Sequence, residues 1–174
     1  RLPGGDAGTR KPARVALAHL LAAGLALDDN LPPRAALSPA ERSVVEKQAA
    51  GGLNSPLTSS MGRLFDAVAS LIGLRQIVNY EGQAAIELEA IADTSEQGEY
   101  AFEFRTVEGG AWSVEGAPVI RTVVQDFHAG VATPVIAARF HNGVAVMIRD
   151  VCVRLREERA LNQVALSGGV FQNV

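Results

Sequence analysis

The closing stretch of the chain, residues 162–174, constrains the fold more than any other segment. It begins with a short apolar run, Val164 to Leu166, and breaks at Ser167-Gly168-Gly169. A run of this length bounded by turn residues is typical of a buried strand. Glycines at the carboxyl end of a strand let backbone N–H groups approach a ligand, because no Cβ is in the way. The stretch therefore predicts the edge of an α/β sheet at which a nucleotide phosphate can bind.

A simpler interpretation of the same glycines stays open. A bare junction between a strand and a helix also contains two glycines, and such short motifs occur freely by chance. The chain ends at Val174, where the following helix should begin, and it starts without Met at Arg1, in a turn-like stretch. We therefore expect the sequence to be a piece of a longer protein.

Composition narrows the class of protein. The chain has 174 residues, of which 48% are hydrophobic and 20% charged, so it is globular. Its net charge is −3 and its Lys and Arg residues do not cluster, which gives no support to nucleic-acid binding. No apolar run approaches the roughly 20 residues that span a membrane, and no signal peptide is visible. The single cysteine, Cys152, excludes an internal disulfide and favours a reducing cytoplasm.

Helical periodicity dominates residues 11–92. Pro12 opens a helix that is expected to run through about residue 27. Ser38-Pro39-Ala40-Glu41 is a capping signature for a second helix ending near residue 50. Apolar residues at helical spacing follow in 61–73, and another helix is expected over 84–92. Asp66 lies off the apolar stripe of its helix, near the amino end, where an acid interacts favourably with the helix dipole.

Residues 99–174 combine strands with longer helices. Strands at 100–104 and 112–114 flank a glycine turn and predict a hairpin. A helix is expected from 118 to about 127, and the longest one from 133 to about 159. The chain then enters the closing strand. We interpret residues 1–174 as one fragment with a helical part (11–92) and a part that holds the hairpin, long helices and closing strand (99–174).

Spacing alone gives no catalytic constellation, so the catalytic residues are unknown at this point. His19, His128 and His141 include no pair at the i, i+4 spacing that binds a metal. No Ser-His-Asp arrangement stands out, and Cys152 fits a buried, inert thiol better than a nucleophile. The residues best placed to bind a ligand are in loops: Ser59, Ser60, Gly62, Gly82, Gln83, Ser167, Gly168, Gly169 and Asn173.

Four segments in order carry a family resemblance: SMGRLFDAVA at 60–69, YEGQAA at 80–85, ARFHN at 138–142 and LSGGVFQN at 166–173. Together they resemble the HypF family of hydrogenase maturation carbamoyltransferases, within its carboxyl-terminal module. That module is similar to tRNA threonylcarbamoyltransferases and antibiotic O-carbamoyltransferases. The resemblance implies a helix-rich α/β fragment, an incomplete actin-like or sugar-kinase-like (ribonuclease H-like) module comprising mainly the second lobe.

The resemblance also implies a reaction. The family takes carbamoyl phosphate and ATP, forms a carbamoyl adenylate, and passes the carbamoyl group to a cysteine thiol of the partner protein HypE. The product becomes the cyanide ligand of nickel–iron hydrogenase. A divalent metal, zinc or iron, polarises the adenylate, and its ligands would lie outside this chain. We therefore expect a cytoplasmic carbamoyltransferase fragment that is inactive alone.

Carried over residue by residue, the family's nucleotide contacts fall on a small set. Gln83 departs from the pattern, because the tRNA-modifying relatives have a second glycine there. An acid can accept from ribose hydroxyls, and glycines admit phosphate to backbone N–H groups. The expected nucleotide-binding residues are Asp66, Gly82, Gln83, Glu87, Gly168, Gly169 and Asn173.

Two other functions stay open at the sequence level. One is an O-carbamoyltransferase of small-molecule biosynthesis, which would use the same adenylate chemistry on a hydroxyl group. The other is a non-catalytic helical module that docks a maturation partner and binds no nucleotide. Binding of ATP or AMP distinguishes the docking module from either enzyme.

Overall fold

The computed structural model describes residues 1–172. Over this range the chain is helix-rich, with a small two-stranded sheet. The helices are α1 (Asp6–Thr9), α2 (Pro12–Ala22), α3 (Pro32–Ala35), α4 (Pro39–Gly51), α5 (Met61–Leu71), α6 (Gln83–Ala90), α7 (Ala117–His128) and α8 (Thr133–Arg159). The strands are β1 (Glu103–Thr106) and β2 (Trp112–Glu115), and two 3₁₀ turns are η1 (Glu108–Gly110) and η2 (Gly169–Gln172).

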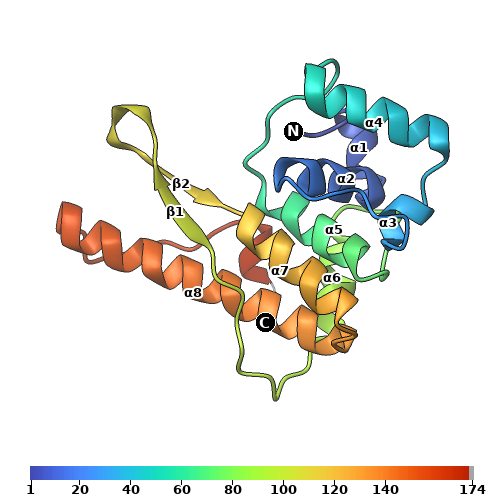
Figure 1. The fold of residues 1–174 in the computed structure, drawn as a ribbon. Coiled ribbons are helices and arrows are strands. Elements are labelled where there is room, and N and C mark those ends of the chain that lie inside the picture. The colour runs from blue at the N-terminus through green and yellow to red at the C-terminus, as the bar shows by residue number, and fades with distance from the viewer. Residues whose placement is uncertain (173–174) are drawn as a thin grey trace.

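Helix α5 is the centre of the fold. It packs against α2, α3, α6 and α7 (Figure 1). Every residue from Leu64 to Leu71 is buried, as expected of a helix that is surrounded on all sides. The largest fully buried side chains around it include Leu17 and Leu20 of α2 and Phe140 of α8. The polar residues of α5 are therefore held in a low-dielectric interior rather than in solvent.

The capping signature at Ser38 is confirmed. The hydroxyl of Ser38 accepts from the Glu41 N–H at 3.3 Å, and the Glu41 carboxylate accepts from the Ser38 N–H at 3.1 Å. The expected end of the first long helix near residue 27 is wrong, because α2 ends at Ala22. Gly24 adopts a φ of 70°, a left-handed conformation that terminates the helix.

The expected hairpin is confirmed, with a shifted first strand. β1 pairs with β2 in antiparallel register, with Phe104 opposite Val114. Strand β1 begins at Glu103 rather than at residue 100, because the backbone N–H of Tyr100 donates instead to the Arg139 carbonyl of α8. The hairpin and the carboxyl half of α8 project from the helical body (Figure 1). Arg154 joins the two, with its guanidinium carbon 4.8 Å from the Phe104 ring centroid.

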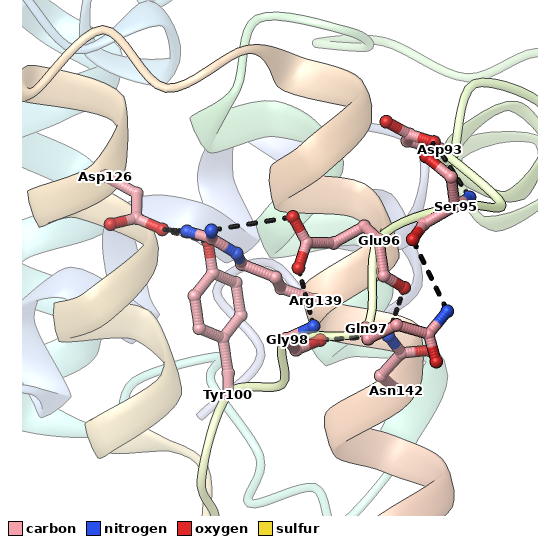
Figure 2. Close-up of polar contacts among 9 residues, drawn as sticks. All are labelled: Asp93, Ser95, Glu96, Gln97, Gly98, Tyr100, Asp126, Arg139 and Asn142. Atoms are coloured by element: carbon pink, nitrogen blue, oxygen red, sulfur yellow. Dashed lines mark hydrogen bonds and ion pairs between the residues drawn. The ribbon is translucent and has the colours of Figure 1, made fainter.

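A polar network fixes the 93–100 segment onto α7 and α8 (Figure 2). Arg139 pairs with Asp126 at 2.9 Å and with Glu96 at 3.5 Å. The Tyr100 hydroxyl donates to Asp126 at 2.7 Å. Asn142 donates to the carbonyls of Glu96 and Gly98 at 3.1 and 2.9 Å. The ARFHN segment thus holds the connection between α6 and the hairpin in place.

The closing strand is a wrong prediction. Val164 and Leu166 are 60% and 59% exposed, and residues 160–167 have no regular secondary structure. A strand needs a neighbouring strand to satisfy its backbone N–H and C=O groups. Among residues 1–172 the only sheet is the β1–β2 hairpin, and this segment does not pair with it. The run is as apolar as a buried strand, but the described part of the chain offers it no strand to pair with.

None of the helices in residues 1–172 combines the length and the hydropathy that crossing a membrane requires.

Candidate functional site

Asp66 is buried in the middle of α5 rather than exposed near its amino end. The residue is 3% exposed and lies beyond the first turn of the helix, so the interpretation as an acid near the amino end that interacts with the helix dipole is wrong. Arg63 Nη1 lies 2.7 Å from Asp66 Oδ2, one helical turn earlier. This ion pair lacks the alignment of a hydrogen bond. Burial raises the pKa of Asp66 to about 6, although the Arg63 guanidinium acts to lower it.

Two adjoining cavities meet at this pair, and we call them together the Asp66 cleft. The smaller cavity has a volume of about 400 Å³ and the larger about 800 Å³. Arg63, Asp66, Glu81 and Gly82 line both. The smaller cavity is completed by Asp6, Thr9, Arg10, Val78, Asn79 and Tyr80. The larger one is completed by Ser60, Met61, Gly62, Phe65, Ala85, Ile86, Glu89, Gly169, Val170 and Gln172.

The turn before α6 brings Gly82 to the cleft. Gly82 has a φ of 81°, a conformation that favours glycine, and it caps the amino end of α6. No heavy atom lies within 4 Å of where its Cβ would be, so the space beside this backbone is open. No side chain caps α6, which leaves N–H groups of its first turn for a ligand. The structure therefore supports close approach of a ligand to the backbone at Gly82.

Gln83 and Glu87 are engaged in supporting this turn. The Gln83 side chain is buried, accepts from the Asn79 N–H at 2.8 Å and donates to Glu87 at 2.9 Å. Glu87 also accepts two hydrogen bonds from Arg75, at 2.6 and 2.7 Å. Arg75 is the main cause that holds the pKa of Glu87 below its usual value. Neither side chain lines the cleft, so both shape its wall from behind.

Residues from the closing stretch reach the same cleft in part. Gly169, at the start of η2, lines the larger cavity. Gly168 precedes it with a φ of 92°, in the turn that leads into η2. Asn173 lies outside the described residues. The structure thus brings Asp66, Gly82 and Gly169 together, across more than 100 residues of sequence.

Sequence reasoning missed Arg63 and several acidic residues of the cleft. Arg63 could have been identified, because residues i and i+3 of a helix share a face and an Arg there can pair with the acid. Glu81 could have been found next to Gly82, within the same turn. Arg10 and Asp6 could not, because they come from a distant segment of chain. Only the folded arrangement places α1 beside the turn at residue 80.

The histidines stay outside the cleft, and among residues 1–172 no three His, Cys, Asp or Glu side chains gather in a metal-binding group. His128 Nε2 lies 3.5 Å from Asp28. His141 Nδ1 contacts the Ala137 carbonyl of its own helix at 2.8 Å, and its ring packs on Phe65. These side chains therefore serve packing and surface contacts.

The Asp66 cleft has the chemistry of a site for a polar ligand with an apolar part. A buried carboxylate accepts from hydroxyl groups, and the open amino end of α6 favours an anion. Met61, Phe65, Ile86 and Val170 supply apolar walls. Such a mixture of apolar surface with a few convergent polar groups is typical of small-molecule sites.

Comparison with known proteins agrees with the family resemblance. A family model described as "Carbamoyltransferase, Kae1-like Domain, second subdomain" matches residues 1–174. The carbamoyltransferases HypF of Rhodobacter capsulatus and Rhizobium leguminosarum bv. viciae are 39% and 35% identical over 99% of this chain. The chain spans only 22% and 21% of their lengths.

A solved structure gives the same result. It is a full-length HypF in a phosphate- and nucleotide-bound form, which matches 99% of this chain with a TM-score of 0.84 and 33% identity. The match covers 26% of that protein. The helix-rich fold and the sequence together show that this chain belongs to the HypF carbamoyltransferase family, as the second subdomain of the Kae1-like domain.

Proposed function

We propose that the Asp66 cleft binds the nucleotide of a HypF-type carbamoyl transfer. The observation that carries the proposal is the convergence of Asp66, Gly82 and Gly169 on one cleft. These are three of the residues on which the family resemblance places nucleotide contacts. In this arrangement the Asp66 carboxylate accepts from ribose hydroxyls, and the backbone at Gly82, Gly168 and Gly169 receives phosphate oxygens. Asn173 would add an amide that can donate or accept.

Gln83 and Glu87 take a different part in this proposal. Their side chains bond to each other, to Arg75 and to the backbone of Asn79. They would therefore contribute to nucleotide binding by fixing the turn that carries Gly82. Direct contact between Glu87 and a ribose would require Glu87 to give up Arg75, at the cost of a charge-assisted pair.

The family resemblance supports a proposal for the reaction of the parent protein. It would form a carbamoyl adenylate from carbamoyl phosphate and ATP and transfer the carbamoyl group to a cysteine thiol of a HypE-like maturation protein in the cytoplasm, for the cyanide ligand of nickel–iron hydrogenase. The divalent metal, zinc or iron, would be held by residues outside this chain. The cleft would supply nucleotide binding and orientation, and the fragment by itself would not complete the transfer.

Thermal unfolding with millimolar ATP or AMP tests the nucleotide site. A ligand that binds only the folded state at 100 times its Kd stabilises it by about 2.7 kcal/mol. We expect a rise in Tm for the wild-type chain and for Glu46→Gln, which changes an acid on α4 away from the cleft. Asp66→Asn should abolish the rise. A wild-type chain whose Tm does not respond would contradict the nucleotide site and favour a docking module.

A further inference from the structure

Arg63 and Asp66 form a buried ion pair at the junction of the two cavities. Their side chains are 13% and 5% exposed, and Nη1 lies 2.7 Å from Oδ2. Both contacting atoms are inaccessible to solvent and have no hydrogen-bond partner within the described part of the chain. Removing one member of such a pair leaves the other as an uncompensated charge in a low-dielectric site. The ionisation of the Asp66 carboxyl therefore depends on Arg63.

The other charged groups of the cleft cannot replace this guanidinium. Glu81 precedes α6, Glu89 lies on it, and Asp6 lies on α1, so all three would oppose ionisation of Asp66. Arg10 is the other cation that lines the cleft, and no ion pair joins it to Asp66 among residues 1–172. Burial favours the protonated carboxyl, and among the ion pairs of residues 1–172 it is Arg63 that contacts the carboxylate directly.

We propose that Arg63 is the positioning residue of the nucleotide site, which keeps Asp66 ionised and oriented so that its carboxylate accepts the ribose hydroxyls. The inference rests on the proposed function, and it adds a dependence of affinity on the protonation of one carboxyl. A protonated Asp66 loses its negative charge, and one of its oxygens becomes a donor, so it holds a diol less well. An Arg suits this task because its guanidinium stays charged at any pH the protein meets.

The test is the affinity for adenosine across pH 5 to 9, measured by calorimetry. Adenosine is chosen because it carries no phosphate that would titrate in this range. For the wild-type chain the association constant should rise about tenfold between pH 5 and 7 and then level off, as expected for a carboxyl that titrates near 6. Asp66→Asn should give a weak and flat profile.

Substitution of Arg63 gives the deciding comparison. Arg63→Gln should move the midpoint of the profile upward by at least about one pH unit, so affinity at pH 7 drops about tenfold and recovers at pH 9. Arg63→Lys should keep the midpoint nearer to that of the wild type. Lys11→Gln removes one positive charge from a surface pair with Glu41 and should leave the midpoint unchanged. A residue that merely stabilised the fold would lower affinity without moving the midpoint.

The outcomes separate this inference from the proposed function. A wild-type chain that binds neither ATP nor adenosine overturns both. Binding of ATP without adenosine, or a midpoint that is the same in Arg63→Gln and the wild type, overturns the role of Arg63 alone. If Arg63→Gln does not fold, as judged by circular dichroism, Arg63→Met replaces it and should show the same upward shift of the midpoint. A midpoint that persists in Asp66→Asn would show that another group titrates and would contradict the proposal.

Discussion

Gly143, in the middle of α8, lies directly against the backbone of Tyr100, so that a Cβ on the glycine would overlap the Tyr100 carbonyl oxygen. Glycine inside a helix normally costs about 1 kcal/mol relative to alanine. Here it permits the 98–101 segment to cross the helix at backbone distance. The same contact brings the Tyr100 N–H to the Arg139 carbonyl at 3.1 Å. The hairpin therefore starts from a fixed point on α8.

Replacing this glycine should reverse the usual effect of alanine in a helix. Gly143→Ala is expected to lower the free energy of unfolding by about 1–3 kcal/mol, because the backbone of Tyr100 must move. Gly51→Ala, in the last turn of α4 with open space around it, is the matched control and should be neutral or stabilising. Urea denaturation of both variants measures the difference. An equally neutral Gly143→Ala would show that the segment is not held at this distance.

The network around Arg139 should behave as one unit. Tyr100→Phe removes the hydroxyl that donates to Asp126 and is expected to cost about 1 kcal/mol. Asp126→Asn should cost more, because Arg139 loses its 2.9 Å partner. A double-mutant cycle measured by urea denaturation should give a coupling of about 1 kcal/mol between Tyr100 and Asp126. Strict additivity of the two changes would contradict the network.

The amino end of α4 offers a local test. Ser38→Ala removes the hydroxyl that accepts from the Glu41 N–H and should destabilise the chain by about 1 kcal/mol. Ser43→Ala, at an exposed position within the same helix, should be neutral or slightly stabilising, because alanine is the better helix former. Equal effects of the two substitutions would mean that the cap contributes nothing measurable.

The burial of His19 predicts that the folded chain loses stability in acid. Burial, and secondarily the amino terminus, lowers the pKa of His19 to about 4, below its ordinary value of about 6.5. The unfolded chain binds the proton more tightly, so this contribution to stability is complete above pH 6.5 and is lost as the pH falls towards 4. The loss is about 3 kcal/mol. His19→Gln should remove that slope in the free energy of unfolding.

Titration of Asp66 changes the free energy of unfolding in the opposite direction to His19, over an overlapping pH range. Its raised pKa means that the folded chain holds the proton more tightly, so its contribution is lost as the pH rises through about 6. The contribution of His19 is therefore measured as the difference in free energy of unfolding between the wild type and His19→Gln at each pH. His128→Gln, a change at a half-exposed histidine, controls for the substitution itself. A difference that stays constant from pH 7 to 4 would contradict the buried state of His19.

Local signals predicted much of the helical fold. The Ser38 cap, the start of α8 at Thr133-Pro134 and the β1–β2 hairpin each depend on residues close in sequence, and each is confirmed. The prediction of a closing strand at residues 164–166 is wrong because a strand depends on residues distant in sequence. Its regularity depends on a partner strand, and composition alone does not supply one.

The sequence predicted which residues line the candidate site better than it predicted their burial and their ion pairs. The family resemblance selected Asp66, Gly82 and Gly169, and these do line one cleft. The burial of Asp66 could not be derived from the helical stripe, because α5 is enclosed on all sides by segments from the whole chain. The pairing of Glu87 with Arg75 was missed because Arg75 lies in the connection between α5 and α6, whose course the sequence pattern does not predict.

The most direct test is to map the amide resonances of the isotopically labelled chain during titration with AMP. The largest saturable shifts should fall on residues of the Asp66 cleft, above all Asp66, Gly82 and Gly169, and should be absent in Asp66→Asn. Saturable shifts confined to other surfaces, such as the cavity lined by His141, Asn142 and Phe171, would contradict a nucleotide site at the Asp66 cleft, and so would the absence of saturable shifts at millimolar AMP.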